Sequence, residues 1–414
     1  MTTTIGTLNA GGDFASLMKT KYSSDKVIEQ VFKKRPALAM LPKDESWGGQ
    51  TYNIPVYDGD PQGGLSPDFA SGSNGVANST VGAAQFALTT VYNYNQASIT
   101  GEVIAAGRAG SDQFFLDGVQ KTVDGVLRAV GGKIEGDLFR GYLGVIATTS
   151  SVTTTVITLS DAADALRFEV GMIIQASPDL TSARGTAGNR ITAINRSAGT
   201  ITFATAVNDA TLGWAVSDYL CIHGSVASTS VISGFPVWLT TGTPGTLFGV
   251  TRSTDKERRS GIAITGQSSN IEEALLDAID FANEQEGEPD VCFMNFRDFN
   301  SLKKQLGSKV TYTRTPGVKS NGAPTQTGFS GIEIVSASGP VKIIPANKCP
   351  RGTIYMLDSK TWVLASRGPI VQLVNWDGDK LSRLLTSDAY EVRAVSYCQL
   401  GCRAPGHNVR ITLS

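Results

Sequence analysis

The residue types that most often carry chemistry are scarce in this sequence. Its two histidines, His223 and His407, both lie in turn-like surroundings, CIHGS and PGHNV. A catalytic triad or a zinc cluster needs an imidazole held beside its partner side chains, and neither context supplies them. We therefore interpret both histidines as turn or surface residues, and we predict neither a catalytic nor a metal site.

The five cysteines show neither the even number of a disulfide framework nor the CxxC spacing of a metal cluster. Cys398 and Cys402 are four residues apart, which on a helix would place both thiols on one face. Their surroundings, YEVRAVSYCQL, are typical of a strand instead, and there too they share one side. We predict reduced thiols in the core for the whole set, which is Cys221, Cys292, Cys349, Cys398 and Cys402.

Loops that bind phosphate or calcium are also hard to find. The sequence has no GxxxxGK[ST] and no strand-linked GxGxxG, so the anion-binding loops of nucleotide enzymes are absent and no cofactor is predicted. WDGDK, at 376–380, has carboxylates in a calcium-like order but lacks the later ligands of a calcium loop, and we interpret it as an Asp-Gly turn. An enzyme, for example a small hydrolase, would need a nucleophile beside a base. We find no such pair and expect a protein that is not an enzyme.

Length and composition predict a globular protein. The chain has 414 residues, of which 41% are hydrophobic, enough for roughly two to three domains with cores. Lys and Arg number 36 against 37 for Asp and Glu, so no strong net field steers the molecule toward nucleic acid or an acidic membrane. The start has no apolar signal region, and the chain has no run of about 18 apolar residues. We expect a cytoplasmic protein that is not embedded in a membrane.

A long polar ribbon lies between two strand-like stretches near the start of the chain. It covers 57–85 and is rich in Gly, Ser and Pro, whereas QTYNIPVY before it and QFALTTVYNYNQASIT after it are typical of strands. Its charges are acidic, and an acidic ribbon needs a partner that is not. We predict that it contacts a neighbouring molecule through Asp58, Asp60, Asp68 and Phe69.

Two basic clusters are candidate partners of this ribbon. One follows the β-rich middle of the chain and consists of Arg252, Arg258 and Arg259. The other is opposed in its span only by Asp298 and comprises Arg297, Lys303, Lys304, Lys309, Arg314 and Lys319. That both clusters are simply solvated faces is an equally good interpretation.

The strongest helical pattern runs from Ser111 to Leu143. At 1.5 Å per residue this helix would be about 45 Å long. Before it, residues 1–43 have the character of an arm, whose basic cluster of Lys33, Lys34 and Arg35 is either a solvated helix end or a contact with nucleic acid or a neighbour. The apolar residues that recur every three or four positions along the helix are Phe115, Val119, Val123, Val126, Val130, Ile134 and Leu138.

The remainder of the chain predicts a mixed α+β protein. Between 148 and 224 short β-rich runs alternate with turn residues, and Asn195–Gly199 has the features of a hairpin turn. We expect an inserted small β-barrel or sandwich there. NIEEALLDAIDFANEQEG follows as an amphipathic helix that Asn270 can cap. A strand (DVCFMN), a short helix (FRDFNSLKKQLG) and several more strands complete the chain.

The order of these elements resembles the Hong Kong 97-like fold of the major capsid proteins of tailed double-stranded DNA bacteriophages, a fold shared with encapsulin shells. NFRDFNSL at 295–302 is similar to a turn and short helix of that family, although Phe296 stands where proline is common. Three later passages add to the resemblance: FSGIEIVSASGP at 329–340, GTIYMLDSKTWVL at 352–364, and the segment 377–413. Each motif is weak alone, and their order is the specific signal.

The resemblance implies a division of the chain. The family's parts would be an N-terminal arm (1–43), an extended hairpin called the E-loop (44–109) and a long spine helix in a peripheral P-domain (110–147). An inserted β-domain (148–224), P-domain strands with a connection (225–261), an A-domain (262–375) and a return to the P-domain (376–414) would follow. The inserted domain departs from the minimal fold and argues against a plain encapsulin.

The resemblance also implies a function and partners. The chain would assemble as hexamers and pentamers into the icosahedral shell of a virion, in the cytoplasm of the host bacterium, around double-stranded DNA that it contacts without sequence preference. A separate scaffolding protein, a portal and a decoration protein would be further partners. Some relatives cross-link an E-loop lysine to a neighbour, but no lysine lies between Lys43 and Lys121, so we expect a noncovalent shell. An encapsulin-like cargo compartment and a phage tail or tube protein are the alternatives.

Overall fold

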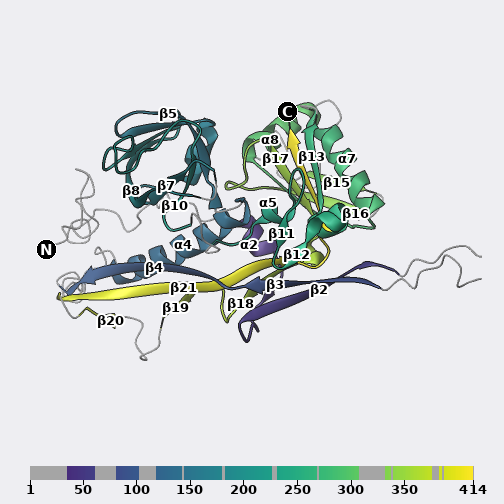
Figure 1. Cartoon of the computed structure of the whole chain (residues 1–414), viewed down its shortest axis with the longest axis horizontal. Coiled ribbons are helices and arrows are strands. Elements are labelled where there is room, and N and C mark those ends of the chain that lie inside the picture. The colour runs from purple at the N-terminus through teal and green to yellow at the C-terminus, as the bar shows by residue number, and fades with distance from the viewer. Residues whose placement is uncertain are drawn as a thin grey trace, which may run out of the picture.

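The computed structural model describes the chain in eleven stretches, and the main elements are two six-stranded sheets, a closed barrel, a two-stranded hairpin and one long helix (Figure 1). The protein is therefore α+β, as predicted. The described residues are 35–60, 81–101, 118–141, 144–179, 182–225, 231–267, 270–306, 332–336, 339–374, 382–384 and 387–413.

The first sheet, here called the β21 sheet, is built around the longest strand of the described chain. β21 pairs with β4 from Ala389↔Thr100 to Cys398↔Val91, which makes the long ribbon at the bottom of Figure 1. Its strands are β1 (Lys43–Asp44), β4 (Val91–Thr100), β18 (Trp362–Ser366), β19 (Gln372–Leu373), β20 (Ser382–Arg383) and β21 (Ala389–Cys402).

The long helix α4 (Gly118–Leu138) lies along this ribbon and packs on β4 and β21. Its buried hydrophobic side chains are Val126, Val130, Ile134 and Leu138, four of the positions that the apolar spacing singled out. The helix ends earlier than predicted, at Leu138 rather than Leu143. At 1.5 Å per residue its 21 described residues span about 31 Å. Residues 111–117 of the expected helix lie outside the described residues.

The two strand-like flanks of the ribbon form a hairpin of β2 (Thr51–Gly59) and β3 (Gly82–Thr89), which lies beneath the rest of the body at the lower right of Figure 1. The strands pair antiparallel, with Ile54 opposite Phe86. Because side chains alternate along a strand, one face is buried through Ile54, Val56, Phe86 and Leu88. The ring of Phe86 meets Trp238 edge to face at 5.0 Å, so this face is part of the body's core.

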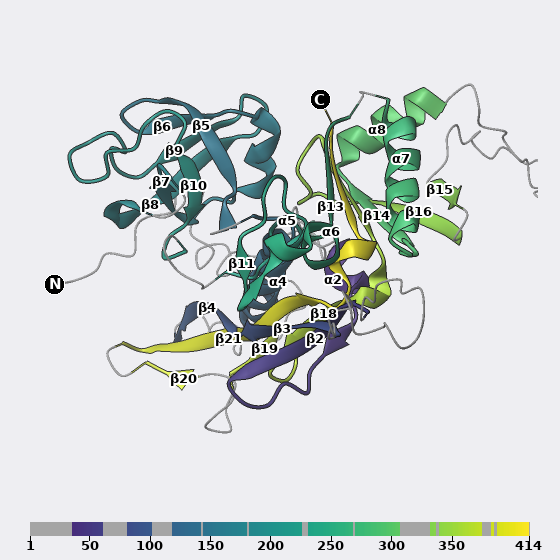
Figure 2. The same ribbon diagram turned by 45° about the vertical axis from the view of Figure 1, so that its right-hand side comes forward.

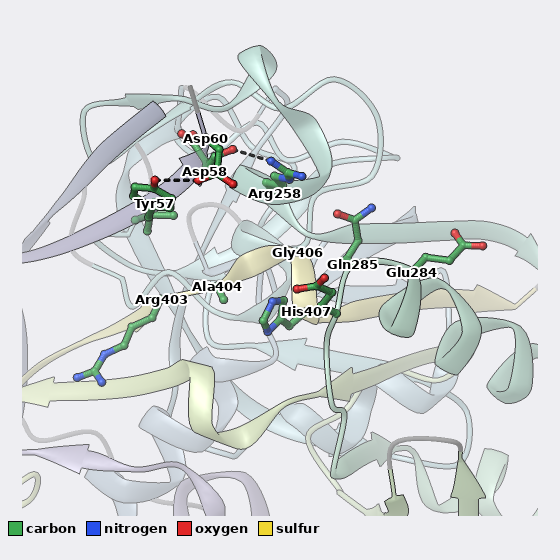
Figure 3. Close-up of a pocket in the computed structure, with 13 residues that line it drawn as sticks. Tyr57, Asp58, Asp60, Arg258, Glu284, Gln285, Arg403, Ala404, Gly406 and His407 are labelled. Carbon is green, nitrogen blue, oxygen red and sulfur yellow. Dashed lines mark hydrogen bonds between the residues drawn. The ribbon is translucent and has the colours of Figure 1, made fainter. Parts of the chain in front are cut away.

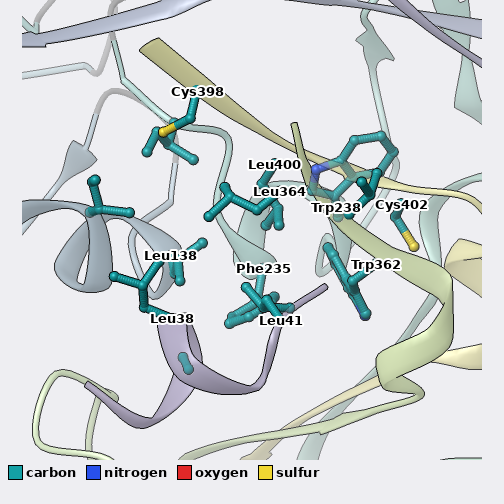
Figure 4. Close-up of a cluster of buried hydrophobic side chains, with 14 of the residues drawn as sticks. Leu38, Leu41, Leu138, Phe235, Trp238, Trp362, Leu364, Cys398, Leu400 and Cys402 are labelled. Carbon is teal, nitrogen blue, oxygen red and sulfur yellow. The ribbon is translucent and has the colours of Figure 1, made fainter. Parts of the chain in front are cut away.

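That core is centred on aromatic side chains of the short helix α5 (Phe235–Trp238) and strand β18. Phe235 and Trp362 meet edge to face at 5.0 Å, and Leu38, Leu138 and Leu364 point toward the same interior (Figure 4). Residues from the arm, the long helix, the hairpin and the β21 sheet therefore share one hydrophobic core.

The second sheet, here called the β17 sheet, carries α7 (Ile271–Glu284) and α8 (Phe296–Gln305) on one face (Figure 2). Asn270 occupies the position before α7 but makes no side-chain capping bond; the N–H of Ile271 donates to Gln305 Oε1 at 2.9 Å instead. Its strands, in spatial order, are β13 (Ile262–Gln267), β22 (Val409–Leu413), β17 (Thr353–Leu357), β14 (Val291–Met294), β16 (Gly339–Pro345) and β15 (Ile332–Ser336).

Four strands pair with partners that lie far from them in the sequence or outside the stretch in which they lie. β4 leaves the hairpin after Thr90 and joins β21, although its sequence continues the strand-like flank. β18 and β19 belong to the β21 sheet rather than to the 262–375 unit. The last strand, β22, does not return to the β21 sheet: Val409 and Ile411 are buried between β13 and β17, and the strand pairs with both.

The β-rich middle of the chain forms a closed six-stranded barrel. The predicted turn is present, since β8 ends at Asn195 and β9 begins at Thr200. The interior is a hydrophobic cluster of its own, in which Phe203 and Trp214 meet edge to face at 5.1 Å. The strands are β5 (Ala147–Val152), β6 (Val156–Leu159), β7 (Ile173–Ser177), β8 (Arg184–Asn195), β9 (Thr200–Phe203) and β10 (Tyr219–Ile222).

All five cysteines are buried and free, as predicted. Cys398 and Cys402 both lie on β21 and face the core (Figure 4). Burial raises the pKa of Cys398 to about 11 and that of Cys402 to about 12, so both remain thiols at neutral pH. The predicted turn at 376–380 lies outside the described residues.

Candidate functional site

The structure brings the acidic ribbon and one of the two basic clusters together within a single chain. The carboxylate of Asp58, at the end of β2, accepts a short hydrogen bond from Arg259 Nε, and Arg258 Nη1 donates to the carbonyl oxygen of Asp58 at 2.8 Å (Figure 3). The side chains of Asp58 and Arg259 are only 4% and 15% exposed. The pair therefore fastens the hairpin to the body at the end of its strands next to residues 60–81, here called the hairpin root because the rest of the ribbon continues from it.

The two arginines are positioned by the one-turn helix α6 (Lys256–Ser260). Asp255 caps this helix by accepting from the N–H of Arg258 at 3.2 Å, and Arg259 Nη1 donates to the carbonyl of Thr251 at 3.1 Å. On the hairpin side, a Cβ added at Gly82 would lie 2.8 Å from Asp58 Oδ1. Only glycine leaves room there for the carboxylate to turn toward α6.

A cleft of about 400 Å³ opens beside this root, between the hairpin, α6, the end of α7 and the turn η6 (Pro405–His407) (Figure 3). Tyr57 donates its hydroxyl to Asp60 Oδ1 at 2.9 Å at one side of it. The cleft is lined by more carboxylates than cations: Asp58, Asp60, Glu284 and Glu286 against Arg258, Arg403 and the imidazole of His407. Acidic and basic side chains therefore share the walls of the cleft, and Asp58 is paired with Arg259.

Arg252 was expected in the exposed basic cluster, and that expectation is wrong. Its side chain is fully buried, and its guanidinium donates to main-chain carbonyls, among them Gly245 at 3.1 Å and Val237 at 2.7 Å. These carbonyls end α5 and the loop that follows it. Arg252 therefore organises the interior beneath the hairpin and offers no surface to a partner.

The second basic cluster lies on α8, which covers the β17 sheet away from the hairpin root (Figures 1 and 2). Arg297 and Lys304 are exposed, and Lys303 Nζ lies 4.7 Å from the centre of the Phe299 ring. Asp298 is buried and accepts from the N–H of Gly352 at 2.8 Å, so it does not neutralise the surface of the helix. The candidates that lie outside the described residues are Asp68, Phe69, Lys309, Arg314, Lys319, Lys33 and Lys34.

Sequence reasoning missed a second fastening point, at the end of the arm. Glu135 of α4 is buried, and its two carboxylate oxygens accept from the N–H groups of Ala37, at 3.1 Å, and Leu38, at 2.8 Å. It thereby caps the short helix α2 (Pro36–Met40). Burial raises the pKa of Glu135, against the opposing effect of these two hydrogen bonds. A charged residue beside the apolar stripe of α4 was the one signal that could have revealed it.

Arg35 completes this junction and is not a solvated helix end. Its Nη2 donates to the carbonyl of Arg128 on α4 at 2.6 Å. A Cβ added at Gly131 would collide with the guanidinium, so this glycine, which weakens the helix intrinsically, provides the space for the arm. Burial lowers the pKa of Arg35, while the nearby Glu135 opposes that shift.

The two histidines lie in different parts of the described structure. His407 Nδ1 lies 3.8 Å from Asp358 Oδ2 in the turn η6, and His223 lies at the exit of the barrel. In the part of the chain that the structure covers, no three His, Cys, Asp or Glu side chains gather as metal ligands would. No described helix is both long and apolar enough to cross a membrane.

Comparisons with known proteins agree on the architecture. No family model and no curated protein sequence matches the chain. Among solved structures, the cyanophage A-1(L) capsid asymmetric unit matches with a TM-score of 0.54 and 12% identity, over 94% of this chain and 95% of that one. The capsid of Myoviridae phage XM1 (TM-score 0.49, 8% identity, 95% and 97% covered) and an empty GTA particle capsid (0.49, 7%, 99% of both) are also similar. The chain therefore has the Hong Kong 97-like fold of the phage major capsid proteins that its sequence resembles.

Proposed function

We propose that this chain is a major capsid protein, which assembles into the icosahedral shell around the double-stranded DNA of a tailed bacteriophage. The observation that supports this proposal most is the structural match with the cyanophage A-1(L) capsid, which covers 94% of this chain and 95% of the other. The described surface agrees with such a role, because a hairpin with no core of its own extends from a body that anchors it (Figure 1).

A shell subunit has to make several different contacts that close under symmetry. The pair of Asp58 and Arg259 holds the hairpin at the point where residues 60–81 continue from it, so this segment would start from a fixed place on the body when it reaches a neighbour. The arm is likewise attached to α4 through Glu135 and Arg35. We infer that these two extensions make the inter-subunit contacts, and that the barrel is an insertion on the shell's surface rather than part of its framework.

For the hairpin we infer an electrostatic contact with the exposed side of α8 on a neighbouring subunit. Asp60 and Asp68 would face Arg297 and Lys304, with Phe69 adding an apolar contact, while Asp58 acts inside its own chain. The test is assembly of a charge-reversed Asp60→Lys, Asp68→Lys variant at low and high salt. We expect impaired assembly at low salt, restored by Arg297→Glu with Lys304→Glu; unchanged shells under both conditions would rule out the contact.

The shell would be noncovalent. No lysine lies between Lys43 and Lys121, so the hairpin carries no amine that could attack an asparagine of a neighbour. Denaturing electrophoresis of purified particles should yield a single band at the mass of one chain, 43.7 kDa. A ladder of covalent multimers would contradict this part of the proposal.

Electron microscopy of the protein expressed alone, and with candidate scaffolding and portal proteins, tests the function itself. We expect shells built of hexamers and pentamers, formed more regularly when the scaffolding protein is present. A small uniform shell that packages protein cargo would favour the encapsulin-like alternative, and a tube would favour a tail protein. Particles assembled in the bacterial cytoplasm and filled with DNA of no particular sequence would complete the assignment.

A further inference from the structure

A second pocket, far smaller than the cleft at the hairpin root, lies where the chain enters and leaves the barrel. Its volume is about 170 Å³. α4 contributes Lys133 and Asp137 to it, and Arg140 follows directly after the helix. The other wall is the barrel exit, including His223, and Tyr92 of β4 stands at the rim, 52% exposed. The residues of the hairpin root take no part in it.

Two polar atoms of this pocket are buried without a hydrogen-bond partner in the described structure. Arg140 and Asp137 are 5% and 1% exposed, and Arg140 Nη1 donates to Asp137 Oδ1 at 2.7 Å. Arg140 Nε and Asp137 Oδ2 remain unmatched. An unmatched buried polar atom costs the fold more than one hydrogen bond contributes. Arg140 Nε and Asp137 Oδ2 therefore offer one donor and one acceptor to a ligand that enters the pocket.

The charges of the pocket favour an anion. Lys133 and Arg140 are cationic, His223 can add a further N–H donor, and Asp137 is the one acid among the lining residues. Burial lowers the pKa of Arg140 and raises that of Asp137, so both side chains would gain from a ligand that restores polar contacts. At about 30 Å³ of liquid volume per water, the space exceeds the size of several waters and admits a small tetrahedral oxyanion.

We propose that this pocket binds a phosphate group that still carries a proton, either inorganic phosphate or the singly charged form of a phosphate monoester, which prevails below about pH 6. The phosphate oxygens accept from Lys133, Arg140 Nε and His223, and the phosphate hydroxyl donates to Asp137 Oδ2. Sulfate has the same shape but no proton at neutral pH, and a phosphate diester has none either. Asp137 is therefore the residue that discriminates among tetrahedral anions, and the inference stands independently of any capsid role.

Titration calorimetry on the purified full-length subunit tests this assignment with four probes: inorganic phosphate, phenyl phosphate, sulfate and dimethyl phosphate. We expect phosphate to bind at least about tenfold more tightly than sulfate, since one charge-assisted hydrogen bond separates the two. Phenyl phosphate should bind as weakly as sulfate at pH 7 and several-fold more tightly at about pH 5.5, where it carries a proton. Binding at pH 7 as tight as that of inorganic phosphate would overturn the role assigned to the phosphate proton. Dimethyl phosphate that binds more tightly than phosphate would overturn it, because the site would then suit the diesters of DNA.

Three variants separate recognition from folding. Lys133→Gln removes a cation near the mouth of the pocket and should weaken phosphate and sulfate alike, by about tenfold. Asp137→Asn should erase the preference for phosphate over sulfate, whereas Lys121→Gln, on the same helix but outside the pocket, should change neither affinity. If Asp137→Asn fails to fold, the proposal is still tested by the affinities of Lys133→Gln and by the ratio of the phosphate affinity to the sulfate affinity of the unaltered protein. Unchanged affinity in Lys133→Gln, or equal binding of the two anions, would overturn the proposal.

Discussion

The hairpin of β2 and β3 and the barrel of β5 to β10 both extend outside the two main sheets, yet they are stabilised in opposite ways (Figure 1). The barrel closes on itself and encloses its own hydrophobic cluster. The hairpin has two strands, and its buried face belongs to the core that also contains Trp238 and Trp362. Two strands alone are marginally stable in water. The barrel is thus a self-contained unit, whereas the hairpin is an extension of the body's core.

Ion pairs follow the same division. In the barrel, Arg184 pairs with Asp218 at 2.6 Å and Arg196 with Glu169 at 3.2 Å, so both pairs join barrel residues to each other. The pair at the hairpin root joins β2 to α6, about two hundred positions later in the chain. A structural change in the hairpin should therefore affect the body, whereas a structural change in the barrel should leave the body unaltered.

Removing the ring that connects the hairpin to the core should have the largest effect. Phe86→Ala takes away a fully buried side chain against Trp238, and we expect the free energy of global unfolding to fall by about 3–5 kcal/mol. Denaturant titration followed by tryptophan fluorescence measures this. Tyr57→Ala, on the exposed face of the same hairpin, is the matched control and should change stability by less than about 0.5 kcal/mol. Equal effects would mean that the hairpin is not part of the core.

A cavity inside the barrel should act locally. Ile201→Ala removes a fully buried side chain there, and we expect the barrel to lose about 2–4 kcal/mol. Hydrogen exchange read by mass spectrometry should then report faster exchange in β5 to β10 and unchanged exchange in β21 and α7. Faster exchange throughout the protein would show that barrel and body unfold together, and the contrast with the hairpin would disappear.

The parts of the fold that depend on local pattern were predictable. The apolar spacing of Val126, Val130, Ile134 and Leu138 identified the buried face of α4, and the alternation around 57–85 identified both strands of the hairpin. Helix periodicity and strand alternation are properties of a few consecutive residues. The turn between β8 and β9 was found for the same reason.

The parts that depend on distant partners were not predictable. Nothing near Thr90 marks the point where the chain leaves the hairpin, because the residues on both sides suit a strand equally well. Arg252 was wrongly predicted to be exposed. Its guanidinium donates to main-chain carbonyls of α5, and the sequence alone does not show which carbonyls need a side-chain donor. The ion pair at the hairpin root was predicted only in part. Asp58 and Arg259 were both named as contact residues, but as partners in two different molecules rather than within one chain.

Breaking the ion pair at the root should loosen the hairpin without affecting the barrel. Asp58→Asn leaves Arg259 without its charged partner, and we expect a loss of about 2 kcal/mol in stability, with faster hydrogen exchange in β2 and β3. A double-mutant cycle with Arg259→Gln isolates the energy of the pair. A coupling energy near zero would mean that the contact positions the strands without stabilising them. Glu169→Gln in the exposed barrel pair is the control and should have little effect.

The smallest effect is expected at the buried carboxylate that caps the arm helix, and it depends on pH. Because burial raises the pKa of Glu135 above its ordinary value of 4.5, the folded protein binds this proton more tightly than the unfolded chain does. The stabilising contribution is therefore complete below about pH 4.5 and is lost as the pH rises through the raised pKa. Glu135→Gln lacks this dependence and loses one acceptor for α2, which we expect to cost about 1 kcal/mol.

The measurement is a series of denaturant titrations of both proteins between pH 4 and pH 8. The advantage of the unaltered protein over Glu135→Gln should shrink as the pH rises, since Glu135 is then ionised in a buried setting that still offers the N–H groups of Ala37 and Leu38. Glu333→Gln, at an exposed position on β15, should run parallel to the unaltered protein throughout. If the stability of Glu135→Gln also runs parallel to that of the unaltered protein, the two hydrogen bonds to Glu135 offset the effect of burial on its pKa. Glu135 would then hold the arm helix as a charged carboxylate throughout this pH range.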